Sequence, residues 1–299
     1  MSIIQWNCRG LSSSTEQIKT MFRDYDAKIV CLQETKIGDK PFNPGLNYKF
    51  ERSPPIQAAR ARGGTGFIIH RSIKYETTLL NTELQACAVR VNIGKKITLC
   101  SLYLEPTLEN FLTDHSGNPR QLILADLQNL IDQLPTPFIL MGDFNAKHTL
   151  WGGTICDRWG NLIEELLDRN DLILMNDGSP TRYDVYHNST SAIDLTICSS
   201  SIRLDYLWSV NKHLHGSDHW PIILKYANNL PSPCSPKWKM EEANWSAYEN
   251  SSHTERVVDD FASPVQAYDH VSNIINDSAI KFIPKSSRLP NKTSCSLVE

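Results

Sequence analysis

The 299-residue chain lacks the sequence features of several protein classes. None of its eight cysteines forms a Cys-x-x-Cys pair, which argues against a zinc ribbon or a redox-active disulfide. No apolar run approaches the roughly 20 residues that a membrane-spanning helix needs. The N-terminus has no basic stretch leading into an apolar one, which is the pattern of a secretory signal. We therefore predict a protein of the nucleus or cytoplasm that is not secreted and has no membrane partner.

The overall charge is nearly balanced, with 30 Lys and Arg against 33 Asp and Glu and a net charge of −3. This balance argues against a protein that coats DNA tightly and without specificity. Residues 1–80 are nevertheless basic, with twelve Lys and Arg against seven Asp and Glu. An enzyme that binds a metal ion in an acidic pocket can still present a basic rim to phosphate, so DNA remains a candidate partner.

Short β-branched runs alternate with amphipathic stretches of helix length over residues 1–226. The predicted strands are Ile3–Trp6, Lys28–Leu32, Gly66–Ile69, Ala88–Ile93, Ile97–Leu104, Phe138–Met141, Ala192–Ile197 and Pro221–Lys225. The predicted helices are Thr15–Tyr25, Arg120–Leu134 and Trp159–Asn170. This alternation predicts the α/β fold class, as a sandwich with sheets in the centre and helices outside.

A proline-rich segment, Leu230–Pro236, interrupts this pattern because three prolines in six residues cannot continue a strand or a helix. We therefore predict one domain over residues 1–228 and a proline-rich linker with a partly helical C-terminal tail over residues 229–299. Two modest helices are expected in this extension, Trp245–Phe261 and Val265–Phe282. The last residues, from Pro284 onward, are polar and predict a loose tail.

Polar side chains gather at or just beyond the ends of the predicted strands, where an α/β sheet presents its functional groups. These residues are Asn7, Glu34, Asp143, Asn145, Asp194 and the segment Ser217-Asp218-His219. A set of carboxylates and amides favours a hard cation such as Mg²⁺ over zinc. Together with a histidine and a tyrosine, the set provides the groups needed for metal-assisted hydrolysis of a phosphodiester.

Each of these residues also has an interpretation without catalysis. Asn7 and Asn145 are typical turn formers, and Glu34 suits either a helix cap or a surface ion pair with Lys36. Asp194 lies between two apolar residues, and a buried carboxylate needs a partner. His219 is the natural partner, which favours a functional role for that pair.

Six ordered motifs resemble the endonuclease/exonuclease/phosphatase superfamily over about three-quarters of the chain: Trp6-Asn7, Gln33-Glu34-Thr35, Leu102-Tyr103, Gly142–Ala146, Ile193-Asp194-Leu195 and Ser217-Asp218-His219. Further motifs resemble the endonuclease domains of arthropod non-LTR retrotransposons, jockey-like elements in particular: Trp6–Leu11, Glu34-Thr35-Lys36, Arg62–Gly66, Asn145–His148, Pro180-Thr181-Arg182 and Ser217–Ile222. In that family the domain is a four-layered α/β sandwich that nicks chromosomal DNA, and the exposed 3′-hydroxyl primes reverse transcription.

The resemblance implies a metal ion and a general base. Glu34 would bind Mg²⁺ with help from Asn7, and Mn²⁺ would serve as a substitute. Asp143, oriented by Asn145, would activate the attacking water. Which carboxylate acts as the general base is open within the superfamily, as is the number of metal ions.

The resemblance also implies roles for the residues around the scissile phosphate. His219, held by Asp194, would contact that phosphate, and Tyr103 would stabilise the charged intermediate. Asp218 would support the metal or neighbouring hydrogen bonds, and Ser217 would contact the phosphate.

The chain departs from the family patterns at a few positions. Arg9 stands where apurinic endonucleases carry an acidic residue, which weakens a repair-enzyme interpretation. Trp159 stands where an arginine is expected, a change more relevant to packing or DNA contact than to chemistry. No Tyr/Phe-x-Asp-Asp block of a reverse transcriptase is found, so that domain is expected to be absent here. Element RNA and a reverse transcriptase would be partners in a full-length parent protein.

Double-stranded DNA is the expected substrate, and several residues are candidates for contacting it. Basic residues bracket the turn Gly63–Gly66, which suits either a phosphate-binding loop or a solvated hairpin: Arg60, Arg62, Arg71 and Lys74. Stronger candidates lie in two other loops: Lys147, His148, Trp151, Thr181 and Arg182. The competing interpretations are a catalytically inactive DNA-binding relic and a superfamily phosphatase or apurinic endonuclease.

Overall fold

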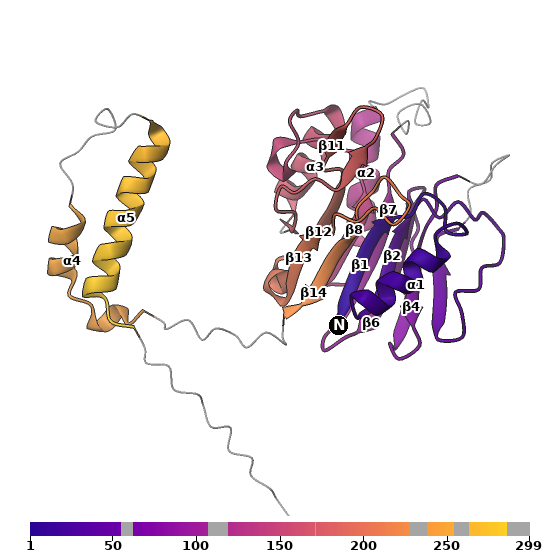
Figure 1. The fold of residues 1–299 in the computed structure, drawn as a ribbon, viewed down its shortest axis with the longest axis horizontal. Helices are drawn as coiled ribbons and strands as arrows, with labels where there is room; N and C mark the ends of the chain where they lie inside the picture. The colour runs from indigo at the N-terminus through magenta and orange to yellow at the C-terminus, as the bar shows by residue number, and fades with distance from the viewer. Residues whose placement is uncertain (55–61, 107–118, 171, 228–237, 254–262, 286–299) are drawn as a thin grey trace, which may run out of the picture. The chain divides into compact units, whose positions relative to one another are not determined.

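The computed structural model describes residues 1–54, 62–106, 119–170, 172–227, 238–253 and 263–285. The chain divides into two compact units, Met1–Ala227 and Asn228–Glu299, which are taken separately below (Figure 1). In the described residues, no helix is both long enough and apolar enough to cross a membrane. Arg60 and the linker predicted at Leu230–Pro236 lie outside the described residues.

Two six-stranded mixed sheets form the centre of the first unit. The first sheet has the order β13 (Tyr206–Val210), β14 (Ile222–Tyr226), β1 (Ser2–Asn7), β2 (Ala27–Gln33), β4 (Thr65–His70), β3 (Tyr48–Arg52). The second has the order β5 (Tyr75–Thr78), β6 (Gln85–Asn92), β7 (Lys96–Tyr103), β8 (Phe138–Asp143), β12 (Asp194–Ser199), β9 (Leu172–Leu174). A separate hairpin joins β10 (Arg182–Asp184) to β11 (Ser189–Ser191).

Alternation of side chains along the strands explains how the two sheets pack. In β1, Ile3 joins the core between the sheets, whereas Ile4 joins the core on the outer face of the first sheet. In β8, Ile139 faces the first sheet and Leu140 faces the opposite way. Successive residues of a strand point to opposite faces, so a strand that is apolar at every position must be covered on both sides.

Three helices cover the outer faces of the two sheets. Helix α1 (Thr15–Asp24) lies on the first sheet through Ile18 and Met21 (Figure 1). Helices α2 (Pro119–Asp132) and α3 (Arg158–Arg169) pack on the second sheet, with Leu127 and Leu166 in the same core. The layers are therefore helix, sheet, sheet and helix, and the predicted four-layered α/β sandwich is confirmed.

The two parallel strand pairs determine where the site forms. Strand β1 runs parallel to β2, and β7 runs parallel to β8, while the other neighbours described are antiparallel. The carboxyl ends of paired parallel strands meet at one sheet edge. Gln5 connects the sheets below this edge, because its side-chain amide donates hydrogen bonds of 3.0 and 3.1 Å to the carbonyls of Gly142 and Leu195.

The described part of the second unit is helical. A short 3₁₀ turn, η5 (Met240–Glu242), precedes α4 (Trp245–Ser252), and α5 (Pro264–Phe282) follows. Helix α4 ends earlier than predicted, because His253 already has an extended backbone, and residues 254–261 of the predicted helix lie outside the described residues. Small C-terminal helices are thus confirmed, and the segment predicted as a loose tail is described only as far as Lys285.

Candidate active site

Asn7 joins two carboxylates at the carboxyl edge of the sheets. Its side-chain nitrogen donates to Glu34 Oε1 at 3.0 Å and to Asp143 Oδ2 at 2.8 Å. Asn7 ends β1, Glu34 follows β2 and Asp143 ends β8, so both sheets contribute to this group. Lys36 forms an ion pair with Glu34, as the surface-pair interpretation of Glu34 expected.

The backbone around these residues adopts conformations that L-residues rarely take. Glu34 has a φ of 50° and Asn145 a φ of 49°. Such conformations are costly for residues with a Cβ and persist only where neighbouring contacts hold them. Near Glu34 these contacts are backbone hydrogen bonds, from Thr35 to the carbonyl of Gly64 and from Lys36 to that of Gly63. Glu34 and Asn145 therefore lie beside Asn7 and Asp143 in a backbone conformation that Asp26 and Asn188 also adopt.

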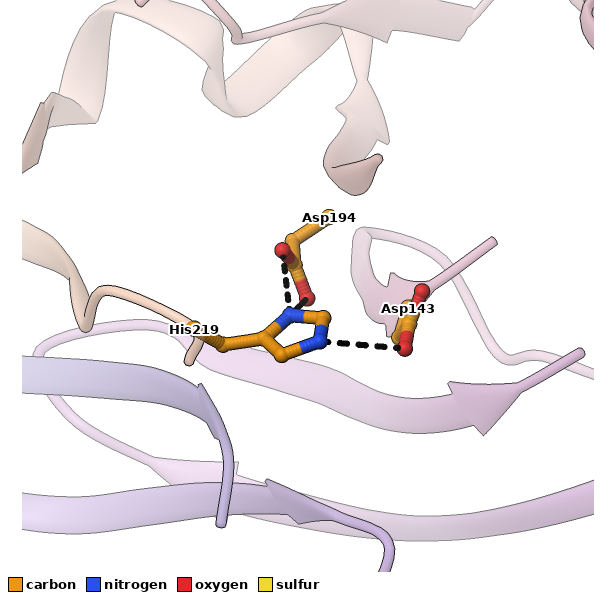
Figure 2. Close-up of side chains that lie close together, drawn as sticks. All are labelled: Asp143, Asp194 and His219. Atoms are coloured by element: carbon orange, nitrogen blue, oxygen red, sulfur yellow. Dashed lines mark hydrogen bonds and ion pairs between the residues drawn. The ribbon is translucent and has the colours of Figure 1, made fainter. Parts of the chain in front are cut away.

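His219 lies between Asp194 and Asp143 (Figure 2). Its Nδ1 is 2.9 Å from Asp194 Oδ2, and its Nε2 is 3.9 Å from Asp143 Oδ2. The hydroxyl of Thr181 donates to the same oxygen of Asp194 at 2.6 Å. The pairing of Asp194 with His219, expected from a carboxylate in an apolar strand, is therefore present in the structure.

The charges of these buried groups depend on one another. Burial lowers the pKa of His219, but the neighbouring carboxylates, Asp194 foremost, outweigh it and raise this pKa to about 9. Burial and the nearby charge of Asp194 raise the pKa of Asp143 to about 7. For Glu34, burial acts to raise the pKa, but Lys36 and the Asn7 amide lower it more. His219 is thus held as a cation beside a carboxyl group that exchanges protons near neutral pH.

Tyr103 and Asn145 border the same group. Tyr103 is the last residue of β7 and is largely buried; burial, then the charges of Glu34 and Asp143, raises its pKa far above its usual value, which keeps the phenol protonated. The backbone N–H of Asn145 donates to Asp143 Oδ1 at 3.1 Å, and the Asn145 side chain donates to the carbonyl of Leu104. Asn145 therefore orients Asp143 through its main chain.

Ser217 and Asp218 belong to the segment before β14. Ser217 is buried; its hydroxyl donates to the Asn7 carbonyl at 2.8 Å and accepts from the His219 N–H at 3.1 Å. Asp218 forms ion pairs with Arg182 and with Arg9. Ser217 thus fastens the end of β1 to the His219 segment, and its burial suits this positioning role better than contact with phosphate.

The other residues predicted to contact DNA differ in their surroundings. Lys147 and Arg62 are exposed, and Arg62 lies 3.9 Å from Glu105. His148 is buried, where its ring accepts from the Leu150 N–H. Thr181 has no exposed surface, because its hydroxyl bonds Asp194 and two backbone N–H groups. Because both side chains are buried, His148 and Thr181 are better placed to support the site than to contact DNA.

The basic residues around the glycine turn do not gather at one place. Gly63 and Gly64 meet the loop after β2, beside Glu34. Arg71 and Lys74 follow the other end of β4, six residues away along an extended strand. The structure therefore places Arg71 and Lys74 away from this turn, because a strand separates them from it.

Two overlapping groups of residues fit a divalent metal ion. Asp143, Asp194 and His219 offer ligand atoms within 4.8 Å of one another. Asp194 and His219 already bond each other, and a charged imidazole repels a cation. Glu34 and Asp143 instead offer carboxylate oxygens, the donors that hard cations prefer, and the side-chain nitrogen of Asn7 contacts both of them. The structure therefore contains an acidic group suited to a metal ion.

Sequence reasoning gave no site role to Gln5 and noted Arg9 only as a departure. Gln5 is a buried polar residue between Ile4 and Trp6, the same signal that identified Asp194, and could have been found in that way. Arg9 lies two residues beyond Asn7 in an exposed loop, and its pairing with Asp218 depends on a contact across more than two hundred residues. No local pattern reports such a contact.

Comparison with known proteins gives consistent results. Residues 97–223 match the family described as endonuclease-reverse transcriptase. The RNA-directed DNA polymerase from the mobile element jockey of Drosophila melanogaster is 27% identical over 76% of this chain and 24% of its own length. The corresponding jockey protein of Drosophila funebris is 23% identical over 94% of this chain and 29% of its own length. The chain thus spans about a quarter of these relatives.

Solved structures share the fold. The endonuclease domain of TRAS1, a telomere-specific non-LTR retrotransposon, has a TM-score of 0.62 and 20% identity over 75% of this chain and 97% of that domain. The apurinic endonuclease LMAP of Leishmania major has a TM-score of 0.60 and 15% identity over 75% of this chain and 86% of its own. The resemblance read from the sequence motifs is confirmed: the chain is similar to jockey-type RNA-directed DNA polymerases, matches the endonuclease-reverse transcriptase family over residues 97–223, and shares the fold of the retrotransposon endonuclease domain.

Proposed function

We propose that the first unit is a Mg²⁺-dependent endonuclease that nicks double-stranded DNA by hydrolysing a phosphodiester bond. The observation that carries this proposal is the shared position of Asp143. One of its oxygens meets the Asn7 amide that also holds Glu34, and the same oxygen faces His219. A metal-binding group and an acid–base pair therefore meet at one carboxylate, as phosphodiester hydrolysis requires.

Glu34 would hold the metal ion with help from Asn7, whose side-chain nitrogen contacts the Glu34 carboxylate. When bound, Mg²⁺ would polarise the phosphate and neutralise part of its charge. Lys36 pairs with Glu34 in the absence of a metal ion and keeps this carboxylate charged. Mn²⁺ has the same preference for oxygen ligands and is expected to substitute.

Asp143 suits the role of general base. Its pKa is raised to about 7, and a base is most effective when its pKa lies near the working pH. The Asn7 side chain and the Asn145 N–H each hold one of its oxygens, which fixes the direction in which the carboxylate accepts a proton from water. Neither donor competes for that proton.

His219 and Tyr103 suit stabilisation of the charge that develops on the phosphate. Asp194 keeps the imidazole charged and oriented, and Thr181 holds Asp194 in turn. The Tyr103 phenol stays protonated and can donate a hydrogen bond. Donors fixed in place before the reaction lower the barrier because they need no rearrangement.

The polymerases to which this chain is homologous suggest what the nick is for. A hydrolysed phosphodiester that leaves a 3′-hydroxyl provides a primer end, and the relatives are named as RNA-directed DNA polymerases. We propose that the nick primes reverse transcription of an element RNA by the polymerase of a longer parent protein. The proposed compartment is the nucleus or the cytoplasm.

Conversion of supercoiled plasmid to open circles tests the endonuclease. Wild type is expected to nick in Mg²⁺ and to stop in EDTA, and Glu34→Gln is expected to lose at least about 100-fold in rate. The matched control is Glu76→Gln, which makes the same change at an exposed position in β5. Equal rates for Glu34→Gln and wild type would overturn the metal assignment. A folded wild type without activity in either Mg²⁺ or Mn²⁺ would instead indicate an inactive DNA-binding relic.

A further inference from the structure

Two arginines converge on one carboxylate beside the proposed catalytic histidine. Asp218 Oδ2 lies 3.0 Å from both Nε and a terminal nitrogen of Arg182. Asp218 Oδ1 lies 3.3 Å from a terminal nitrogen of Arg9 and 3.8 Å from Nε2 of His219. Arg182 begins β10, Arg9 follows β1 and Asp218 precedes β14, so three distant segments build this cluster.

The arrangement leaves excess positive charge facing solvent. Two guanidinium groups meet one carboxylate, which gives the cluster a net charge of about +1. The Arg9 and Arg182 side chains are 54% and 36% exposed, whereas the Asp218 side chain is 13% exposed. A neutralising pair alone would need one arginine for one carboxylate, so the second arginine has a charge that Asp218 does not balance.

The contacts with Asp218 use part of the hydrogen-bonding capacity of the arginines. Each guanidinium has five N–H groups in a rigid plane. Arg182 donates a hydrogen bond to Asp218 through Nε and places one terminal nitrogen 3.0 Å from the same oxygen, whereas Arg9 forms an ion pair with Asp218 without a hydrogen bond. A carboxylate and a phosphate present similar pairs of oxygens to such a fork. The N–H groups of Arg9 and Arg182 that do not contact Asp218 therefore suit the oxygens of a DNA phosphodiester.

Backbone contacts hold the cluster against the proposed catalytic residues. The Tyr183 N–H donates to the carbonyl of Asp218 at 2.8 Å, and the Trp220 N–H donates to the carbonyl of Thr181 at 2.7 Å. The Tyr183 and Trp220 rings stack nearly in parallel, 6.1 Å apart. The β10 strand is thus fixed beside His219, and the distance between the arginines and the scissile position is set by the fold.

We propose that Arg9 and Arg182 together bind a second DNA phosphate next to the scissile one, and that Asp218 holds both guanidinium groups in place while DNA is absent. This inference rests on the proposed DNA substrate, although it does not require cleavage. Asp218 then competes with the phosphate for the arginines. Its removal should therefore strengthen DNA binding.

Equilibrium binding of a fluorescent DNA duplex in EDTA, followed by anisotropy over a range of salt concentrations, tests the proposal. Arg9→Gln and Arg182→Gln are each expected to weaken binding by about 10-fold at low salt and to reduce the salt slope by about 1. Arg71→Gln is the matched control, since Arg71 is exposed at the opposite end of β4. Arg182→Lys keeps the charge and should recover the slope but only part of the affinity.

Asp218→Asn is the decisive variant, with an expected tightening of at least about 3-fold under the same conditions. The proposal would be overturned if Asp218→Asn bound DNA no more tightly than wild type. It would also be overturned if the arginine variants behaved like Arg71→Gln, or if wild type did not bind the duplex. Thermal unfolding of each variant shows whether weaker binding comes from lost structure. A protein that binds in this pattern but never nicks plasmid would keep this inference and reject the endonuclease, so the two failures are distinguishable.

Discussion

Thr181 shows how one hydroxyl can organise a site without touching the substrate. The group donates to Asp194 and accepts from the backbone N–H groups of Ile193 and Asp194. In the sequence, Thr181 precedes Arg182 in a polar loop, so both residues looked like candidates for contacting DNA. The structure distinguishes the two residues, because the side chain of Thr181 is buried and that of Arg182 is partly exposed.

The charge on His219 makes the stability of the protein depend on pH. Its pKa in the folded protein is raised from 6.5 to about 9; burial opposes this shift and Asp194 is its largest favourable cause. A raised pKa contributes stability that is complete below about pH 6.5 and is lost as pH rises through about 9. We therefore predict that His219→Asn destabilises the protein more at pH 6 than at pH 9.5, by at most about 3 kcal/mol.

Urea unfolding in metal-free buffer at the two pH values measures this difference. The protein that keeps His219 and the His219→Asn variant should both carry Asp143→Asn. Asp143 also exchanges protons near pH 7 and would otherwise add its own pH dependence to the comparison. Equal losses of unfolding free energy at pH 6 and pH 9.5 would show that the imidazole is not charged by Asp194. The Asp143→Asn protein itself provides the reference curve.

At the scale of elements, the start of α3 supports the loop that follows Asp143. The Asp157 side chain caps the helix through the Gly160 N–H at 2.7 Å, and the Asp157 N–H bonds the carbonyl of Lys147. A Cβ on Gly160 would lie 2.0 Å from that carbonyl oxygen. The loop with Lys147 and His148 therefore depends on the absence of a side chain at this position.

Gly160→Ala is predicted to destabilise the protein by about 1–3 kcal/mol, since the clash with backbone outweighs the roughly 1 kcal/mol that alanine gains in helix propensity. The neighbouring Asn161→Ala is the matched control at an exposed position of the same helix and should be neutral or slightly stabilising. Chemical denaturation of both variants gives the comparison. A Gly160→Ala protein as stable as Asn161→Ala would mean that the loop can move away without cost.

Apolar runs predicted eight of the described strands and missed six: β3, β5, β9, β10, β11 and β13. Among the missed strands, β9 is a short apolar run of three residues. Strand β8 is apolar at nearly every position, and β1 carries Ile3, Ile4 and Trp6; both faces of each strand are covered, and the sequence predicted both strands. The hairpin strands β10 and β11 read Arg-Tyr-Asp and Ser-Thr-Ser, which carry no apolar period, and they were missed. Glu34 was found because it follows a strand with a clear apolar run. Arg182 was not placed in a strand because β10 has no such run.

Geometry that depends on contacts between distant segments could not be predicted. The positive φ of Glu34 is held by the Gly63–Gly64 turn, which follows almost thirty residues later. The link from Gln5 to Gly142 and Leu195 crosses from one sheet to the other. Residue patterns identify which side chains suit catalysis, but only the packing of the sheets shows which of them meet.

At the scale of the whole molecule, the first unit contains the cores that position the site. The three apolar cores described for the sandwich draw on residues from Ile3 to Leu224, and β14, the last strand of the first sheet along the chain, ends at Tyr226. A chain of residues 1–227 is therefore predicted to fold by itself and to nick plasmid at the rate of the full chain.

Thermal unfolding and plasmid nicking of this shortened chain test the prediction. Its Tm should lie within about 3 °C of the corresponding transition of the full chain, which is the shift that about 1 kcal/mol produces in a domain of this size. A shortened chain that is insoluble, or that melts far lower, would show that residues 228–299 stabilise the sandwich. A normal Tm with lost nicking would assign them a part in DNA binding.

The pairing of β1 with β14 has a consequence for the order of events during synthesis. Ser2 pairs with Lys225, so the first strand of the unit to leave the ribosome pairs with the last strand of the unit. Asn7 and Glu34 emerge early, whereas Asp218 and His219 emerge just before β14. A nascent polypeptide therefore has no assembled site until translation has passed residue 226, and whatever hydrolysis the finished protein performs begins only after that point.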